Sequence, residues 1–337
     1  MKPSAWIATA VGALVALPAF ADGELNLYSA RHYDTDERLY SDFEDATGIT
    51  INRIEGKADE LAARLRAEGA NSPADVFLTV DTSRLKRAKD LGLLQAIENP
   101  TLEARIPANL QDEDNFWFGF SQRARVIFYN KETVTNPPQT YADLADPAYK
   151  DKLCIRSSSN VYNQTLLAAM IEHMGEDGAK AWAAGVVDNM ARAPQGGDTD
   201  QLRGIVSGEC EVSVSNTYYF ARAMRQDVRG VSSDIDMIGW VFPDQDGHGA
   251  HMNLSGGGIA AHAPNRDNAI RFLEYLVSEQ AQKYFSDGND EYPVVEGVAL
   301  AAPVAAMGEF KADSVNLAKV AENLPAAQRI FDQVGWE

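Results

Sequence analysis

Alternating strand and helix patterns fill residues 24–92 and constrain the fold more than any other feature of this sequence. Strand patterns at 24–29, 49–54 and 74–80 are each followed by a helix pattern. In the first helix Leu39 and Phe43 share one face, as they do in an amphipathic helix. This β-α-β-α-β-α order predicts a parallel sheet with helices on both faces.

The pattern changes further along the chain. Segments 117–120 and 125–129 read as long strands without an intervening helix. A second α/β unit follows, with a strand at 153–156, helices at 165–174 and 178–190, and a strand at 210–215. The Gly-rich segment 251–260 then precedes an amphipathic helix at 265–278.

We therefore predict an α/β fold of two lobes, each a mixed sheet flanked by helices. The predicted lobes are 22–121 with 254–297 and 122–253 with 298–337. Crossing strands near 121–126 and 253–256 would join them. About 316 residues after the first 21 suit two domains better than one.

Residues 1–21 have the pattern of a signal peptide. Lys2 precedes an apolar run from Ile7 to Phe20, which ends in the cleavage pattern Ala19-Phe20-Ala21. The run is too short for a membrane span. We expect a mature chain that begins at Asp22 and works in the periplasm, with an uncleaved anchor as the alternative.

The charge balance is strongly acidic. Without Lys2 the chain has 29 basic and 49 acidic residues, a net charge of −20. Such a surface repels nucleic acid and anionic membranes and weakly attracts cations. Acidity that serves only solubility is the alternative explanation.

The two cysteines, Cys154 and Cys210, match no zinc signature. An even pair in an oxidising compartment favours a disulfide. In the chain-entropy model this bond would contribute roughly 4 kcal/mol. It would also tie together the two segments that lead to Tyr162 and Tyr218.

Four tyrosines lie at predicted strand ends. Tyr33 follows the first strand, Tyr162 lies between a strand and a helix, and Tyr218 and Tyr219 form a strand-to-helix junction. Ligands of open α/β sheets bind at the carboxyl ends of strands. Phenolates are hard oxygen donors and suit Fe(III). Each tyrosine taken alone is more typical of a half-buried core residue with a wet hydroxyl, and it is the position that the four share at strand ends that favours a site.

Four phenolates around Fe(III) would leave one net negative charge. Arg31 and Arg222 flank the tyrosines in sequence and are the candidates to offset that charge from outside the ligand set. His32 is a candidate fifth ligand or a donor that orients Tyr33; a solvated loop histidine is the alternative. Metal binding to phenols releases protons, so binding should weaken in acid.

Other motifs point away from this site or from catalysis. We interpret His248 and His251 as surface residues of a Gly-rich loop, and Asp81 as the cap of the helix that follows it. The sequence has no Gly-rich phosphate motif, no G-x-S-x-G elbow and no convincing nucleophile with its base. A binding protein rather than an enzyme is expected.

Several segments together resemble the periplasmic ferric-binding proteins, the iron-capturing components of ABC transporters. The similarity covers essentially the whole chain after the signal and is carried by segments 31–33, 72–77, 119–130, 216–219, 254–258 and 262–266. The resemblance implies a transferrin-like type II binding-protein fold. It also implies Fe(III) as the transported ligand and an ABC permease in the inner membrane as partner.

The ligands differ between branches of this family. One branch uses a histidine, a glutamate, two tyrosines and a bound phosphate, but Val80 stands here at the glutamate position. The chain looks closer to the tyrosine-rich branch known from cyanobacteria, which implies Tyr33, Tyr162, Tyr218 and Tyr219 as ligands. That branch does not strictly need an anion, although water or bicarbonate could complete the coordination sphere.

The sequence thus predicts a monomeric two-lobe protein that captures Fe(III) and delivers it to a permease. Three alternatives stay open: a preference for Fe(II), an organic cation or oxyanion as ligand, and a secreted enzyme such as a lyase on the same scaffold.

Overall fold

A parallel sheet opens the fold, as the alternating pattern predicts. The computed structural model describes residues 23–31 and 35–337. Strands β1 (Gly23–Ser29), β2 (Ile49–Glu55) and β3 (Val76–Val80) run parallel in the order β2-β1-β3. The helices that alternate with these strands are α1 (Asp36–Thr47), α2 (Ala58–Glu68) and α3 (Thr82–Asp90).

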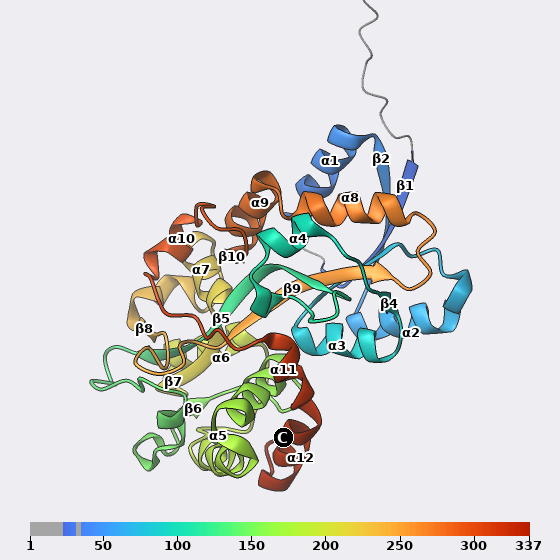
Figure 1. Cartoon of the computed structure of the whole chain (residues 1–337). Coiled ribbons are helices and arrows are strands. Elements are labelled where there is room, and N and C mark those ends of the chain that lie inside the picture. The colour runs from blue at the N-terminus through green and yellow to red at the C-terminus, as the bar shows by residue number, and fades with distance from the viewer. Residues whose placement is uncertain (1–22, 32–34) are drawn as a thin grey trace, which may run out of the picture.

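A glycine-rich strand extends this sheet. Strand β9 (Met252–Ala260) runs antiparallel to β3, and β4 (Leu94–Gln95) pairs with its far end. A Cβ on Gly257 would lie 2.5 Å from the Phe77 carbonyl oxygen, and one on Gly258 2.2 Å from that of Phe116. These close backbone approaches explain why the segment carries no side chains at these positions. Helices α4 (Pro100–Arg105) and α8 (Arg266–Leu276) lie on this part of the molecule (Figure 1).

The longest strand connects two sheets. Strand β5 (Phe118–Asn130) pairs with β9 through residues 118–124 and with β7 through residues 125–129. The two strands expected at 117–120 and 125–129 are thus one strand. No Gly or Pro turn separates them, and nearly every side chain from Phe118 to Asn130 is buried.

The second sheet contains β6 (Leu153–Cys154), β7 (Val212–Asn216) and β8 (Ile238–Val241), and β6 pairs with β7 in parallel. The long helix α5 (Val161–Asp188) is broken at Gly175, whose φ of 75° is not helical. It therefore corresponds to the two helices expected in this region. Helices α6 (Asp198–Ser207) and α7 (Thr217–Arg225) flank β7 in the sequence.

The remaining elements return across both sheets. They are α9 (Glu279–Asn289), β10 (Tyr292–Pro293), α10 (Ala302–Ala306), α11 (Leu317–Glu322) and α12 (Leu324–Val334). Strand β10 pairs with β5, α12 packs on α5, and α11 contacts both α3 and α5 (Figure 1). The last segment of the chain thus bridges the two halves of the molecule.

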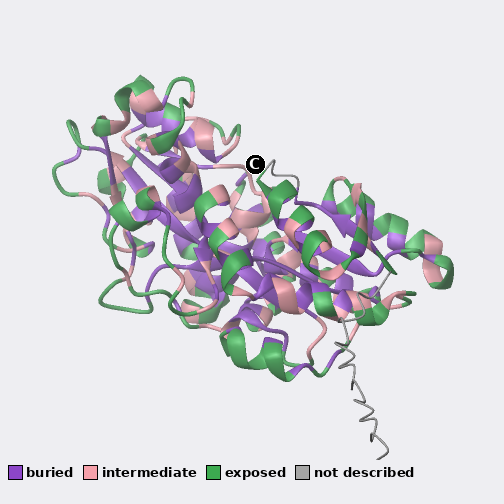
Figure 2. Ribbon diagram, turned by 90° about the horizontal axis from the view of Figure 1, so that it is seen from above, coloured by how far each residue is buried: buried purple, intermediate pink, exposed green. Residues whose placement is uncertain are grey.

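Most strands form the buried interior, and the exposed residues lie mainly on the outer helices, the loops and the edge strand β2 (Figure 2). Within residues 23–31 and 35–337, no helix has both the length and the apolar character that a membrane crossing requires. The predicted lobe boundaries stay a prediction, in which β5 and β9 would be the crossing strands.

Candidate metal site

Three of the four predicted ligand tyrosines lie together at the starts of two helices. Tyr218 and Tyr219 open α7 directly after β7, and their ring centroids are 4.2 Å apart. Tyr162 lies in the first turn of α5, and its hydroxyl is 3.2 Å from the hydroxyl of Tyr218. Because β6 and β7 are parallel neighbours, the helices that follow them start at the same edge of the sheet.

The local sequence explains how these helices begin. The Asn160 side chain accepts a hydrogen bond from the Tyr162 backbone N–H, which caps α5. Strand β7 is wholly buried and ends at Asn216, so α7 begins as the chain leaves the sheet. Tyr218 is buried, whereas Tyr162 and Tyr219 are half-buried. Their phenols therefore combine a fixed position with access from outside.

Tyr33 and His32 lie outside the described residues. The chain on either side of them is described. The guanidinium of Arg31 is buried and makes ion pairs with Asp36 and Glu291, both at 3.2 Å. Thr35 donates a hydrogen bond from its hydroxyl to Asn289. Whether Tyr33 and His32 complete the site stays a prediction.

Arginines surround the tyrosine cluster. The guanidinium carbons of Arg123, Arg125 and Arg156 lie 5.6, 5.7 and 5.5 Å from the centroid of the Tyr162 ring. That of Arg222 lies 5.7 Å from the centroid of the Tyr218 ring. A guanidinium at these distances over an aromatic ring is attracted to the face of that ring. Whether Arg222 offsets the charge of the phenolates stays a prediction.

Sequence reasoning did not identify the arginines around Tyr162. A signal was available, because Arg123 and Arg125 are alternate residues of a largely apolar strand and so share one face of β5. Both are almost fully buried, and a buried arginine requires partners. Arg125 donates to Asp198 at 2.9 Å and to Asn163, next to Tyr162, at 3.0 Å.

Glu291 links the Arg31 segment to the crossing strands. It is fully buried and accepts hydrogen bonds from Arg31 at 3.2 Å, Ser121 at 2.7 Å and Ser255 at 3.2 Å. Burial by itself would raise the pKa of Glu291, but the charges of Arg31 and Arg123, with the hydrogen bonds, hold that pKa below its usual range. This buried network joins the segment before His32 to β5 and β9.

The interpretation of His251 as a surface residue is wrong. His251 is buried, and burial lowers its pKa to about 4. Backbone hydrogen bonds explain why His251 is buried: its N–H donates to the Tyr141 hydroxyl at 2.9 Å, and its carbonyl accepts from the Arg125 N–H at 2.9 Å. These bonds draw the residue inside just before β9. His248 is exposed, as expected, and stacks on His173.

Asp81 caps α3, as expected, because its carboxylate accepts from the Ser83 backbone N–H at 2.9 Å. It has further partners that the capping role does not require. No group of three or more His, Cys, Asp or Glu side chains suited to a metal occurs within residues 23–31 and 35–337. Among these residues the tyrosine cluster is therefore the candidate we consider.

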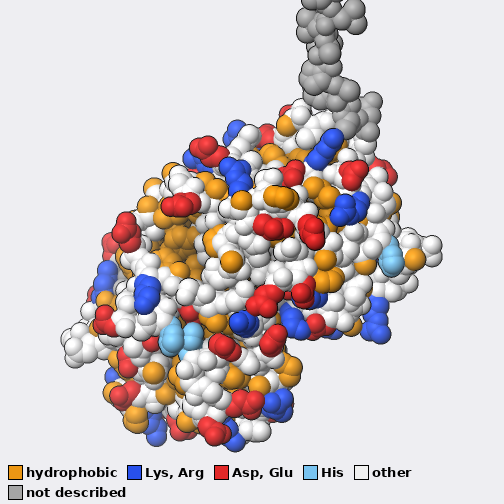
Figure 3. Space-filling model, viewed as in Figure 1, with side chains coloured by type: hydrophobic (Ala, Val, Ile, Leu, Met, Phe, Trp, Pro, Cys, Tyr) orange, Lys and Arg blue, Asp and Glu red, His pale blue; other side chains and the backbone are white. Residues whose placement is uncertain are grey.

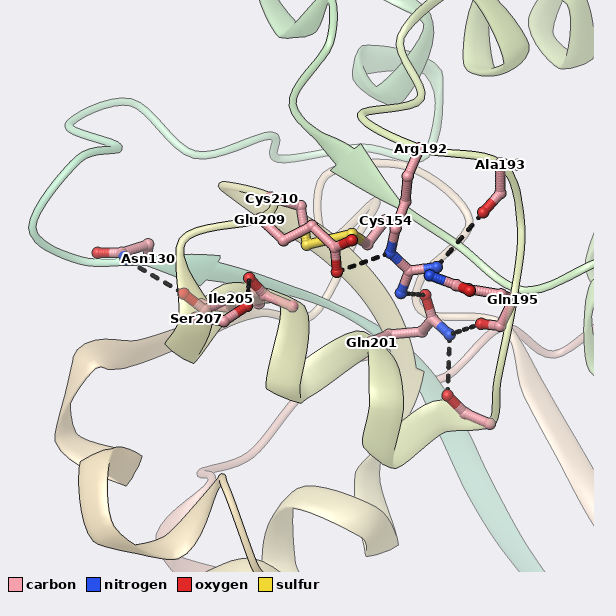
Figure 4. The surroundings of a disulfide bond; sticks show 12 residues. Asn130, Cys154, Arg192, Ala193, Gln195, Gln201, Ile205, Ser207, Glu209 and Cys210 are labelled. Atoms are coloured by element: carbon pink, nitrogen blue, oxygen red, sulfur yellow. Dashed lines mark hydrogen bonds and ion pairs between the residues drawn. A yellow bond between two sulfur atoms is a disulfide. The ribbon is translucent and has the colours of Figure 1, made fainter.

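Cys154 and Cys210 are paired in a disulfide, with Cα atoms 5.7 Å apart. Figure 4 shows the bond beside α6, where a Cβ on Gly204 would lie 2.6 Å from the Cys210 sulfur. Cys210 precedes β7, whereas Tyr218 follows it. The bond therefore fixes β6 against the start of the strand that leads to the tyrosines.

The distribution of charge on the surface bears on the expectation that the protein does not bind nucleic acid. On the face shown in Figure 3, acidic and basic side chains are interspersed and form no continuous basic area. A positively charged footprint is what nucleic-acid binding requires. This face offers none.

Comparison with known proteins gives the family. Residues 71–312 match the family described as bacterial extracellular solute-binding protein. The chain is 48% identical to iron uptake protein A1 of Synechocystis sp. over 316 residues, covering 93% of this chain and 88% of the relative. It is 26% identical to the major ferric iron-binding protein of Neisseria meningitidis, with both chains covered completely.

Solved structures show the same fold. The Trichodesmium protein IdiA (FutA), solved in complex with iron and citrate ligands, is 50% identical and superposes with a TM-score of 0.91, covering 94% of this chain and 100% of that one. Metal-free FutA2 from Synechocystis gives a TM-score of 0.89 at 43% identity, covering 93% and 99% of the two chains. The predicted type II binding-protein fold and the cyanobacterial branch are confirmed.

This chain belongs to the bacterial extracellular solute-binding protein family. The family supplies the substrate-binding components of ABC transporters. The expectation of a binding protein rather than an enzyme is confirmed by this membership and by the relatives, which are iron uptake and ferric iron-binding proteins.

Proposed function

We propose that this protein captures Fe(III) in the periplasm through tyrosine phenolates and delivers it to an ABC permease in the inner membrane. The observation that carries the proposal is the convergence of Tyr162, Tyr218 and Tyr219 at two helix starts. Oxygen donors of this kind match a hard trivalent cation. The relatives named as iron uptake and ferric iron-binding proteins support the same ligand.

The complete ligand set that we propose adds Tyr33 and, as a fifth ligand or orienting donor, His32. Water or bicarbonate would fill a remaining position. Arg31 and Arg222 would offset the negative charge of the phenolates, and Arg123, Arg125 and Arg156 are placed to contribute to the same effect. A metal bound by four phenolates needs such compensation because it carries one net negative charge.

The same proposal includes export of the protein, closure of its lobes over the metal and recognition by the permease. Residues 1–21 would direct export and be removed, leaving a monomer with 22–121 and 254–297 in one lobe and 122–253 and 298–337 in the other. The lobes would close over the metal about β5 and β9, and the permease would recognise the closed form. Closure reports occupancy, so the empty protein would not compete strongly for the permease.

The test is a visible-light titration of the mature protein with ferric citrate. We expect a phenolate-to-iron charge-transfer band that saturates at one iron per chain. Tyr219→Phe should shift the band or remove it, and Tyr218→Phe should abolish tight binding with little loss of stability of the metal-free protein, since each change removes a ligand oxygen and keeps the ring.

Tyr149→Phe is the matched control, because the Tyr149 hydroxyl bonds the Asn136 carbonyl away from the cluster. Its band should equal that of the unchanged protein. A colourless protein with no saturable band would rule out the ferric site. A normal titration in Tyr218→Phe would remove that residue from the ligand set.

A further inference from the structure

Asp81 has a backbone conformation that its capping role alone does not explain. It lies between the end of β3 and the start of α3, is fully buried and has φ 78°. Side chains other than glycine rarely adopt a positive φ. Such a conformation persists where the surrounding contacts determine it, and it occurs preferentially near functional sites.

The contacts that hold Asp81 come from three elements. Its carboxylate accepts from the Ser83 N–H of α3 at 2.9 Å, from the Asn253 amide of β9 at 2.6 Å and from the Thr165 hydroxyl of α5 at 2.8 Å. Its own N–H donates to the Leu254 carbonyl of β9 at 2.8 Å. A buried carboxylate with several donors is strongly held. Asp81 therefore joins the first sheet, a predicted crossing strand and the helix that carries Tyr162.

The bond to Thr165 reaches the candidate metal site through the helix. Thr165 is fully buried and lies three residues after Tyr162 in α5, so the two side chains are neighbours on the surface of the helix. A constraint on the Thr165 hydroxyl is thus a constraint on where the Tyr162 ring projects. Tyr162 in turn meets Tyr218 through its hydroxyl.

The Thr165 hydroxyl also has a second acceptor. The carbonyl oxygen of Val161, in the same helix, lies 2.8 Å away. A hydroxyl has a single proton to donate, so only one of the two acceptors receives it fully at any time. The carboxylate is the stronger acceptor. If α5 moves away from Asp81, the hydroxyl still has a partner, and no buried donor is left unsatisfied.

We propose that Asp81 is a positioning residue for the Tyr162 phenol: through Thr165 it fixes the first turn of α5 against the first sheet and thereby slows metal release. The inference rests on the proposed function, because it assigns Asp81 a role in the geometry of that same ferric site. Among the described residues, the partners of the Asp81 carboxylate named above are groups of α3, β9 and α5, so Asp81 acts on Tyr162 through the helix.

The experiment compares Thr165→Val, Thr165→Ser and Thr79→Val with the unchanged mature protein. Valine has nearly the shape of threonine but lacks the hydroxyl, and serine restores it. Thr79 is the matched control: it is a buried threonine of β3, and within the described part of the chain its hydroxyl makes a single 3.4 Å contact, to the Val80 carbonyl. Three quantities are measured: the rate of iron removal by excess chelator, the charge-transfer maximum, and amide hydrogen exchange of residues 161–167 without metal.

We expect Thr165→Val to release iron about tenfold faster, as loss of one hydrogen bond to a charged group predicts. Its charge-transfer maximum should shift and its exchange at 161–167 should accelerate, whereas Thr165→Ser and Thr79→Val should match the unchanged protein in all three. A merely structural role would not move the absorption maximum.

Unchanged release, absorption and exchange in Thr165→Val would overturn the proposal. So would equal effects in Thr79→Val, because the loss would then not depend on Asp81. If the unchanged protein bound no iron, the proposed function would fail, and the exchange comparison in metal-free protein would alone decide whether Asp81 holds the first turn of α5.

Discussion

At the scale of single residues, the candidate site combines phenols that sequence reasoning identified with arginines that it did not. Tyr162 and Tyr218 follow parallel neighbouring strands, so the strand-end rule alone brings their phenols together. Arg123 and Arg125 lie mid-strand, in β5. Their distance to Tyr162 depends on how β5 and α5 pack, and no local pattern contains that information.

His251 gives a residue-scale prediction about acid stability. Burial lowers its pKa to about 4, from an unfolded value near 6.5. As pH falls below 6.5, the imidazole of His251 becomes protonated in the unfolded chain but stays neutral in the folded protein. The free energy of unfolding that this group contributes above pH 6.5 is therefore lost as pH falls. Between pH 6.5 and pH 5 the loss from this group is on the order of 2 kcal/mol.

The variant His251→Phe should show a smaller fall in unfolding free energy over that interval, measured by urea denaturation of metal-free protein at both pH values. Exposed His248 provides the control, and His248→Phe should keep the full fall. An identical pH dependence in the His251 variant and the unchanged protein would mean that the buried imidazole is not the group responsible.

At the scale of elements, the sequence predicts the order of strands and helices well, and it fails where a boundary depends on pairing. The first three strands and their helices occur as expected. The sequence pattern predicts two strands where the structure has the single strand β5. The strand is continuous because one half pairs with β9 and the other half pairs with β7. The pairing partners lie more than 80 residues away in the chain, outside the reach of any local pattern.

The disulfide gives a prediction at this scale. It joins β6 to the start of β7 across 56 residues (Figure 4). The double variant Cys154→Ala, Cys210→Ala should unfold with a free energy lower by roughly 4 kcal/mol, because the unfolded chain regains loop entropy. Urea denaturation without reductant measures the difference.

Added reductant should destabilise the unchanged protein and leave the double variant as it is. The charge-transfer band should survive in the folded variant, since the bond lies at the opposite end of β7 from Tyr218. Equal stability of the two proteins under oxidising conditions would show that the bond contributes nothing to folding.

At the scale of the whole molecule, the fold class was accessible from the sequence because several ordered segments match one family, and the family is confirmed by comparison. The position of the lobes relative to each other was not accessible. It depends on buried contacts between residues far apart in the chain, such as that of the Thr165 hydroxyl with the Asp81 carboxylate, and on α11 lying between α3 and α5.

Metal binding should stabilise the whole molecule. A ligand that binds only the folded state adds about 2.7 kcal/mol at a free concentration one hundred times Kd. We expect ferric citrate at neutral pH to raise the Tm in calorimetry. The rise should shrink in acid, because protons compete with the metal for the phenol oxygens.

The double variant Tyr218→Phe, Tyr219→Phe should show no rise, whereas Tyr149→Phe should respond like the unchanged protein. Citrate without iron is the necessary blank. A rise of the same size with that blank would assign the stabilisation to the organic anion instead of the metal.

The glycines of β9 bear on how the family can diversify. At Gly256, Gly257 and Gly258 an added methyl group would meet backbone oxygens at 2.5 Å or less, so any substitution there must act as a wedge between strands. All three glycines pair with β3, and Gly256 and Gly257 also pair with the start of β5, so a wedge there would displace a predicted crossing strand without touching a single candidate ligand. We therefore expect a substitution at one of these three glycines to change the affinity for the metal, although none of the three carries a side chain that could bind it.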